Sequence, residues 1–492
     1  MTTPRIYDIV LRNGTVIDGT GAPRYMADVA INGDRIAAIR SPGTLKGRQT
    51  INIEGLVVSP GFIDVHTHDD RLVLIDPSMQ PKVSQGIATV VVGNCGISLS
   101  PLKLITSDPV PPLNLLGSRQ DFVFDSMRDY IEAVNQAVPA VNVVALVGHS
   151  TLRVAVMDEL DRPASAEETQ QMRSILRQAL AEGAAGLSSG LYYQPANAAE
   201  MDELVELAKE ASHAGGIYTT HMRDEDDFVM ESLQETFETG RRAEVPVVIS
   251  HHKCAGRKNW GRSVDTLRVI EQAAATQAIH VDAYPYSACS TVLRADAIDE
   301  SIRIIITWST SCPEVAGRDL SDIAAEWQIS QHEACERLSP AGAVYFDMSE
   351  DDVQRILAHP LVMIGSDGIP HDSHPHPRLW GTFPRVLGHY SRDIGLFSLE
   401  EAVRKMTSLP AQRFGLTQRG AIATDHFADL VVFDPATISD AATFEQPIAP
   451  AVGVTLLLVN GQVAYSTRPD LASRRNGRFL TRSGMLSTPL PT

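Results

Sequence analysis

The chain has 492 residues, of which 43% are hydrophobic and 21% are charged, as in ordinary soluble globular proteins. This length can hold a large core and more than one domain. The 60 acidic and 42 basic residues give a formal net charge of -18 without any Lys/Arg-rich block, which argues against nucleic acid or an anionic membrane surface as the main partner.

The chain begins without the long apolar segment of a signal peptide, and no apolar run reaches the ~18 residues that span a bilayer. Its five cysteines are odd in number and scattered along the sequence. This usage favours a reducing compartment over a disulfide framework. We therefore expect a cytoplasmic protein that does not enter a membrane.

Both ends of the chain are rich in short strand-like runs joined by Asn-Gly turns. The first part contains YDIVLRNGTVIDG and DVAINGDRIAAI, and the last part contains ADLVVFD and VTLLLVNGQVAY. Because an isolated hairpin is marginally stable in water, the two ends are expected to need each other. We predict one small β domain built from residues 1–60 and 416–480, with two separate terminal hairpins as the alternative.

Residues 61–415 alternate strand-like runs with helix-like runs such as SAEETQQMRSILRQALAEG, which begins with the capping-box pair Ser165 and Glu168. The eight strand candidates are GFIDVHTH, ATVVVGNCG, VNVVALVGHS, AAGLSSGLYY, GIYTTHMRDE, VPVVISHHK, HVDAYPYS and VMIGSDG. Near-continuous apolar strands that alternate with helices indicate a parallel sheet covered on both faces. Eight such units favour an α/β fold of the (β/α)8 TIM-barrel type, with a doubly wound open sheet as the alternative.

The connection between the seventh and eighth strand candidates is far longer than α/β connections usually are. We expect residues 287–346 to form a lid-like insertion within the catalytic barrel and to cover the active site. An insertion that only packs against a neighbouring subunit is the alternative.

Side chains with metal-binding chemistry end five of the eight strand candidates. They are His66 and His68, then Cys95, His221, His251 with its neighbour His252, and Asp367. Residues two apart in a strand point to the same face, and in a barrel the reactive residues lie at the carboxyl ends of strands. Each residue alone also fits a structural role, but imidazole, thiolate and carboxylate together suit zinc. The pattern predicts a metal centre at one rim of the barrel.

Several longer segments are distinctive: PGFIDVHTHDD, GNCGIS, THMRDE, VVISHHK, DAYPY, GSDG and PHPRLWGTFPRVLG. Together they resemble the N-acyl-D-amino-acid deacylases (D-aminoacylases) of the metal-dependent amidohydrolase superfamily, over nearly the whole chain. The H-x-H and GSDG segments are shared across that superfamily, whereas GNCGIS and HPHPRLWGTF are more specific to this branch. The resemblance implies a (β/α)8 barrel with an inserted lid and a small β-sandwich domain.

The resemblance also implies a zinc-dependent hydrolase that acts on a small molecule, an N-acyl-D-amino acid. Strand four, AAGLSSGLYY, lacks the lysine that many amidohydrolases carboxylate, and Cys95 stands where this family uses a cysteine ligand. The ligands implied for one tightly bound zinc are Cys95, His221 and His251. The ligands implied for a second, weaker site are His66, His68 and Asp367.

By the same resemblance, Asp367 takes a proton from the attacking water and passes it to the leaving nitrogen. Arg378 and Lys253 are implied to bind the α-carboxylate of the substrate. Three further residues match substrate contacts of the family: Tyr193, Tyr284 and Ser290. The preference for the D form follows only from the resemblance.

Two other functions remain open on the sequence. A cyclic amidase of the hydantoinase or dihydroorotase kind shares the barrel and the histidines but would want the lysine on strand four. A non-enzymatic scaffold of the same superfamily typically loses its metal ligands, whereas here they are all present. The preferred side chain and acyl group are undetermined, although a cation in the insertion, such as Arg294 or Arg303, would favour an acidic side chain.

Overall fold

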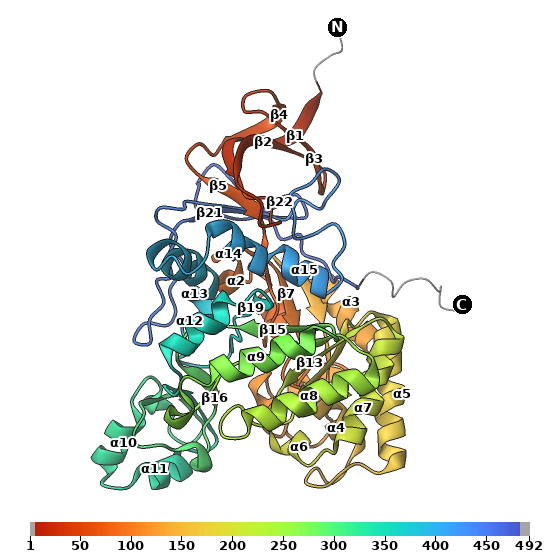
Figure 1. Ribbon diagram of the computed structural model, residues 1–492, viewed down its shortest axis with the longest axis vertical. Coiled ribbons are helices and arrows are strands. Elements are labelled where there is room, and N and C mark those ends of the chain that lie inside the picture. Colours follow the sequence, from red (N-terminus) through yellow and green to blue (C-terminus); the bar gives the residue numbers. More distant parts are fainter. Residues whose placement is uncertain (1–4, 483–492) are drawn as a thin grey trace.

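The computed structural model describes residues 5–482. Strands from both ends of the chain form one eight-stranded sheet, in the order β22-β21-β20-β5-β1-β2-β3 with β4 paired to β1 (Figure 1). The strands are β1 Ile6–Val16, β2 Tyr25–Asn32, β3 Arg35–Arg40, β4 Lys46–Asn52, β5 Val57–Pro60, β20 Leu430–Phe433, β21 Val454–Val459 and β22 Gln462–Ser466. The strand β5 joins the two ends, since it pairs in parallel with β1 and antiparallel with β20.

The two halves of this sheet share one hydrophobic core. Leu11 and Val29 from the first half belong to the same buried cluster as Leu430 and Leu456 from the second half. The halves therefore pack face to face as in a β-sandwich.

Eight parallel strands form the body of the protein, and each coincides with one of the strand candidates of the sequence, β7 and β15 beginning one residue earlier. They are β6 Phe62–Asp64, β7 Ile87–Val92, β10 Asn142–Ala145 continued by β11 Val147–Gly148, β12 Gly186–Gly190, β13 Ile217–His221, β14 Val247–Ile249, β15 Ile279–Ala283 and β19 Val362–Ile364. The first and last strands meet where Thr67 forms a parallel bridge with Gly368. The strands therefore close into a ring, as the prediction of a barrel requires and an open sheet does not.

Helices cover the outside of the ring (Figure 1). The main ones are α3 Met127–Ala137, α4 His149–Val156, α5 Ala166–Glu182, α7 Met201–His213, α8 Val229–Ala243, α9 Ser263–Ala274, α12 Glu350–Ala358, α13 Arg378–Arg385 and α14 Leu399–Met406. The helix α5 starts as predicted, because the Ser165 side chain accepts a hydrogen bond from the Glu168 amide. Among the described residues, no helix combines the length and the apolar character needed to cross a membrane.

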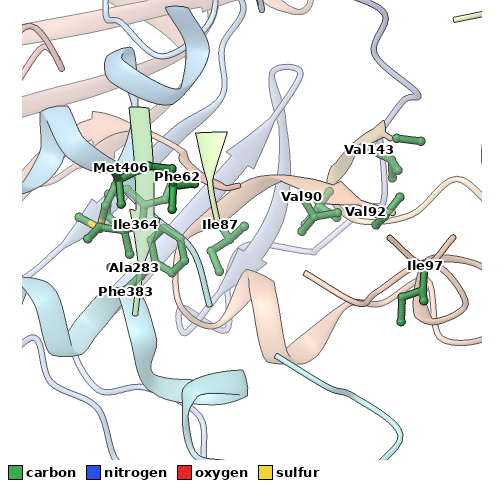
Figure 2. Packing of buried hydrophobic residues seen from close by; sticks show 14 of the residues in the cluster. Phe62, Ile87, Val90, Val92, Ile97, Val143, Ala283, Ile364, Phe383 and Met406 are labelled. Atoms are coloured by element: carbon green, nitrogen blue, oxygen red, sulfur yellow. The ribbon is translucent and has the colours of Figure 1, made fainter. Parts of the chain in front are cut away.

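Barrel strands alternate between two cores, as the two-residue period of a strand requires. On β7, Val90 and Val92 pack outward with the helices, whereas Val91 belongs to the cluster inside the ring. Figure 2 shows Val90 and Val92 in the outer layer together with Phe62 and Phe383. The rings of Phe62 and Phe383 stack with centroids 5.7 Å apart. This packing fixes α13 against the strand that carries the histidine pair.

The segment between β15 and α12 forms a separate small unit (lower left of Figure 1). Its antiparallel strands, in the order β16-β18-β17, are β16 Cys289–Val292, β17 Ile304–Ser309 and β18 Ala341–Tyr345. Two helices complete it, α10 Leu320–Trp327 and α11 Gln331–Leu338. Ile306, Leu320 and Leu338 belong to a hydrophobic cluster of its own. The unit is thus folded around its own core beside the carboxyl ends of the barrel strands.

Candidate metal centre

The six metal-binding candidates of the sequence come together at the carboxyl ends of the barrel strands, and all are buried. Their ligand atoms form two groups in which all atoms lie within 4.8 Å of one another. The first, here called the His221 group, consists of Cys95, His221 and His251. The second, called the Asp367 group, consists of His66, His68, Cys95 and Asp367.

Cys95 belongs to both groups and links them. Its sulfur lies 3.1 Å from Nε2 of His66 and 3.3 Å from Nε2 of His251. Nε2 of His68 lies 3.2 Å from Oδ1 of Asp367, and Nε2 of His66 lies 3.4 Å from the same oxygen. A thiolate at this position is placed to contact ions in both groups.

Three of these residues have a left-handed backbone, which is rare outside glycine. The φ angles are 52° for Cys95, 34° for His251 and 49° for Asp367. Each stands where the chain turns away from the end of its strand. Such conformations cost on the order of 1–3 kcal/mol each and persist where the surrounding structure enforces them, typically at functional sites.

The chemistry of the residues fits a bound metal. His221 is buried, yet neither of its ring nitrogens has a hydrogen-bond partner within the described structure. Burial alone would raise the pKa of the Cys95 thiol. The imidazoles of His66 and His251 nevertheless hold this pKa well below its usual value. Thiolate is the form that binds metal, and buried polar atoms are otherwise almost always paired. A Cys/His2 set of this kind suits zinc.

Carboxylates hold the ring nitrogens that face away from the centre. Nδ1 of His66 lies 3.3 Å from Oδ2 of Asp282, and Nδ1 of His251 lies 2.9 Å from Oε1 of Glu225. Such partners fix the orientation and tautomer of a metal-binding histidine. Asp282 and Glu225 lie in the distinctive segments DAYPY and THMRDE, but nothing in their local pattern predicts that they support metal ligands. His252 turns away from the centre, because neighbouring residues of a strand point to opposite faces, and its Nε2 lies 2.8 Å from Oγ1 of Thr266.

Comparison with known proteins identifies the family. Residues 49–265 and 261–465 match the amidohydrolase family. The chain is 51% identical to a D-aminoacylase of Alcaligenes xylosoxydans xylosoxydans, with 97% of this chain and 98% of that protein covered. It is 48% identical to an N-acyl-D-aspartate deacylase of the same organism, with 96% of this chain and 94% of that protein covered.

The chain belongs to the N-acyl-D-amino-acid deacylases of the amidohydrolase superfamily. A crystal structure of a D-aminoacylase matches this deacylase with a TM-score of 0.94 at 52% identity, covering 97% of this chain and 100% of the other. An N-acyl-D-glutamate deacylase from Bordetella bronchiseptica, solved with zinc and a phosphonate inhibitor, matches with a TM-score of 0.93 at 44% identity, again over 97% and 100%.

A cavity of about 610 Å³ opens over the metal-binding candidates of the deacylase. Among the residues that line it are four of the substrate contacts expected from the sequence: Tyr193, Lys253, Tyr284 and Ser290. Arg378, the fifth, does not line it. It lies behind Asp367, 1% exposed, with its Nη2 2.9 Å from Oδ2 of that carboxylate.

Unpaired donors surround Arg378. Its Nη2 donates to the backbone oxygen of Ser290 at 3.1 Å, and its guanidinium lies 4.7 Å from the centre of the Tyr284 ring. Nε and Nη1 of Arg378, the hydroxyl of Tyr284 and the hydroxyl of Ser290 are buried without hydrogen-bond partners in the described structure. Buried unpaired donors of this kind are costly unless a ligand accepts from them.

Lys82 lies fully buried beneath the centre and was not foreseen, because nothing local distinguishes it from a surface lysine. Its ammonium lies 2.9 Å from Oδ2 of Asp64, 3.2 Å from Oδ2 of Asp69 and 2.9 Å from Oγ of Ser366. The contacts with Asp64 and Ser366 are hydrogen bonds, and the contact with Asp69 is an ion pair. Asp64 precedes the histidine pair by two residues and Asp69 directly follows it. Ser366 directly precedes Asp367, so Lys82 ties together the two strand ends that carry the Asp367 group.

Replacing Lys82 by Met should disturb the Asp367 group and spare the His221 group. Two buried aspartates would lose their cation, so the two strand ends should no longer be held at a fixed spacing. We expect metal affinity at the Asp367 group to fall about 10- to 100-fold, as for other outer partners of metal ligands. Metal titration followed by elemental analysis measures this.

Two control variants make the result specific. Cys95→Ala should remove metal from both groups, because it takes away the ligand they share. The double variant Lys82→Met with Asp64→Asn removes one of the two buried carboxylates that Lys82→Met leaves without a cation. It therefore separates a folding defect caused by buried charge from a loss of positioning. Unchanged metal binding at both groups in folded Lys82→Met would contradict the positioning role.

Proposed function

We propose that the protein hydrolyses the amide bond of N-acyl-D-amino acids with the help of zinc, releasing a carboxylate and a free D-amino acid. The observation that carries this proposal is the Cys95-centred pair of ligand groups beside unpaired buried donors, in a chain that shares about half its residues with named deacylases. A third relative of the same organism, an N-acyl-D-glutamate deacylase, is 46% identical over 98% of both proteins.

Cys95, His221 and His251 would hold the tightly bound zinc, and the Asp367 group would hold a second ion more weakly. When bound, zinc polarises the amide carbonyl and lowers the pKa of a water to about 7. Glu225 and Asp282 keep the imidazoles of His251 and His66 oriented from behind. The protein thus supplies a fixed, water-poor frame in which ligand atoms need not rearrange during the reaction.

Asp367 carries the proton. Burial alone would raise the pKa of Asp367. The charges of Arg378 and His66 nevertheless hold this pKa well below its usual value. The group is therefore a carboxylate at neutral pH. It accepts the proton of the attacking water and then donates it to the amide nitrogen, whose bond to the acyl carbon breaks. Protonation is needed because an amine leaves poorly as an anion.

The cations and hydroxyls at one side of the cavity bind the α-carboxylate. Lys253 lines the cavity, and Arg378, behind Asp367, adds a guanidinium whose Nε and Nη1 have no hydrogen-bond partners in the described structure. The hydroxyls of Tyr284 and Ser290 are unpaired next to it. Since Arg378 is paired with Asp367, a bound carboxylate would compete for the same cation and bring the substrate close to the proton carrier.

The insertion of residues 287–346 serves as a lid in this proposal. Residues from β16 and the loop after it, including Cys289, Ser290 and Ile298, line the cavity opposite the metal-binding candidates. The small β domain, residues 1–60 and 416–480, has no part in the cavity wall among the described residues. We assign a structural role to this domain. The cytoplasmic location of the protein stays a prediction.

The cyclic-amidase alternative loses its support. The strand β12 carries Ser188 and Ser189 and no lysine, and the Ser188 hydroxyl is already bonded to Gly93. The L-hydantoinase of Arthrobacter aurescens shares the fold with a TM-score of 0.58 at only 16% identity, over 97% of this chain and 100% of that protein. That similarity extends to the fold alone.

A kinetic screen tests the proposal directly. Zinc-loaded protein should hydrolyse N-acetyl-D-amino acids at least about 100-fold faster than the L forms, a difference of roughly 2.7 kcal/mol in activation free energy. Amine release by a fluorogenic assay, with metal content measured on the same sample, gives the result. Equal rates on both forms, or hydrolysis of hydantoin instead, would refute it.

Asp367→Asn should keep the zinc of the His221 group and lose turnover. An amide has the size of a carboxylate but cannot carry a proton at neutral pH, so we expect kcat to fall by ~10²–10⁴-fold. Metal content and single-turnover rates should be measured together. Near-normal kcat in a zinc-containing variant would show that another group moves the proton.

Arg378→Lys tests the carboxylate contact. A lysine ammonium cannot reproduce two parallel hydrogen bonds to a carboxylate. We expect kcat/KM for N-acetyl-D-amino acids to fall about 10- to 100-fold, in line with a loss of 1.4–2.7 kcal/mol. The matching amino-acid amides, which lack the negative charge, should lose much less. An equal loss on both substrates would instead indicate that Arg378 acts only through its ion pair with Asp367.

A further inference from the structure

A second cavity of about 560 Å³ adjoins the active-site cavity. It lies between the loop after β7, the short helix α6 (Gln194–Asn197) and the sheet of the insertion. The two cavities share five residues of their walls: Pro112, Tyr192, Tyr193, Val292 and Arg294. The second cavity is therefore a direct neighbour of the first, and these side chains border both.

The lining of the second cavity is suited to an uncharged, apolar guest. Leu293, Trp308 and Pro340 contribute apolar surface, and Arg294 is the single charged residue among the described residues that line it. The remaining polar lining residues are uncharged: Asn114, Gln194, Asn197 and Ser339. The charge of Arg294 is already satisfied, because its guanidinium forms an ion pair with Asp296 and lies 4.4 Å from the centre of the Tyr192 ring. The described residues that line this cavity therefore offer no unpaired cation to an anionic group.

The order of strands in the barrel decides which part of a substrate would reach it. Tyr193 follows β12, whereas Arg378 follows β19, and these strands are four positions apart in a ring of eight. The two side chains thus stand on opposite sides of the barrel mouth, with the His221 group between them. The Tyr193 ring lies 4.9 Å from the His221 ring, directly beside the ligand candidates.

An N-acyl-amino acid has its α-carboxylate and its acyl chain on opposite sides of the amide bond. With the carboxylate at Arg378 and the amide at the His221 group, the acyl chain leaves towards Tyr193. Its first atoms meet the shared wall, and any further methylenes run into the second cavity.

We propose that the second cavity, here called the acyl groove, binds the linear apolar acyl chain of the substrate, so that the enzyme favours N-acyl-D-amino acids with chains longer than acetyl. This inference rests on the proposed function and adds the class of acyl group to it. Each methylene that is fully buried contributes up to about fourfold to binding, and partial burial in an open groove contributes roughly twofold.

A chain-length series tests the acyl groove. The substrates are the N-acetyl, N-butanoyl, N-hexanoyl and N-octanoyl derivatives of one D-amino acid, chosen as the one whose N-acetyl derivative is hydrolysed fastest. The wild-type enzyme should show kcat/KM rising roughly two- to fourfold per methylene until the groove is filled. A flat or falling series overturns the proposal.

Blocking variants locate the effect in the groove. Asn197 and Gln194 line it with exposed side chains, so Asn197→Trp or Gln194→Trp should fill it without disturbing the core. In either variant we expect kcat/KM for the hexanoyl substrate to fall at least fivefold more than kcat/KM for the acetyl substrate. The acetyl chain is too short to reach the groove. Gln120→Trp is the matched control, since this exposed residue lines neither cavity.

The outcomes separate the two proposals. Equal losses on the acetyl and hexanoyl substrates in Asn197→Trp would show a passage common to all substrates and overturn the acyl groove. Absence of hydrolysis for every N-acyl-D-amino acid would refute the proposed function itself. A binding test needs no turnover. In a thermal-shift measurement on the zinc-loaded protein, hexanoate should bind the wild type more tightly than acetate does. This preference should be absent in Asn197→Trp.

Discussion

A thiolate that is kept charged inside the protein is the feature on which the rest of the structure depends. Burial opposes the ionised form of Cys95, and the imidazoles of His66 and His251, at 3.1 and 3.3 Å, together with that of His221, reverse that effect. Those histidines come from different strands, so they meet the sulfur only because the barrel closes. Closure of the ring thus places the groups that stabilise an ionised cysteine at the carboxyl ends of the strands.

Two layers of support maintain this arrangement. Glu225 and Asp282 hold the outer nitrogens of the imidazoles, and Lys82 holds the strand ends from below through two hydrogen bonds and an ion pair with Asp69. The left-handed backbone at Cys95 and Asp367 is local strain that these contacts and the surrounding core can balance. Stability is thereby exchanged for a centre whose ligand atoms are in place before any metal or substrate binds.

The cavity over this centre has two chemically different ends. At one end are Lys253 and the unpaired hydroxyls of Tyr284 and Ser290, with Arg378 behind Asp367, and at the other end Tyr193 borders a second, more apolar cavity. We propose that these two ends bind the two ends of an amide-linked substrate. Deacylases that share the centre can therefore differ in substrate through residues of the insertion and the loops, without change to the metal-binding strands.

Periodicity, turns and capping in the sequence were enough to predict the eight barrel strands, the start of α5 at Ser165 and the strand-end residues that meet at the centre. These features are local: a two-residue period or a capping box is readable within a few positions. The family resemblance added the roles expected of Asp367 and Arg378. Only the tertiary structure decided that Arg378 lies behind Asp367, that Lys82 joins two strand ends and that a second cavity adjoins the first at Tyr193. Those facts depend on contacts between residues that are up to hundreds of positions apart, which exist only once the ring has closed.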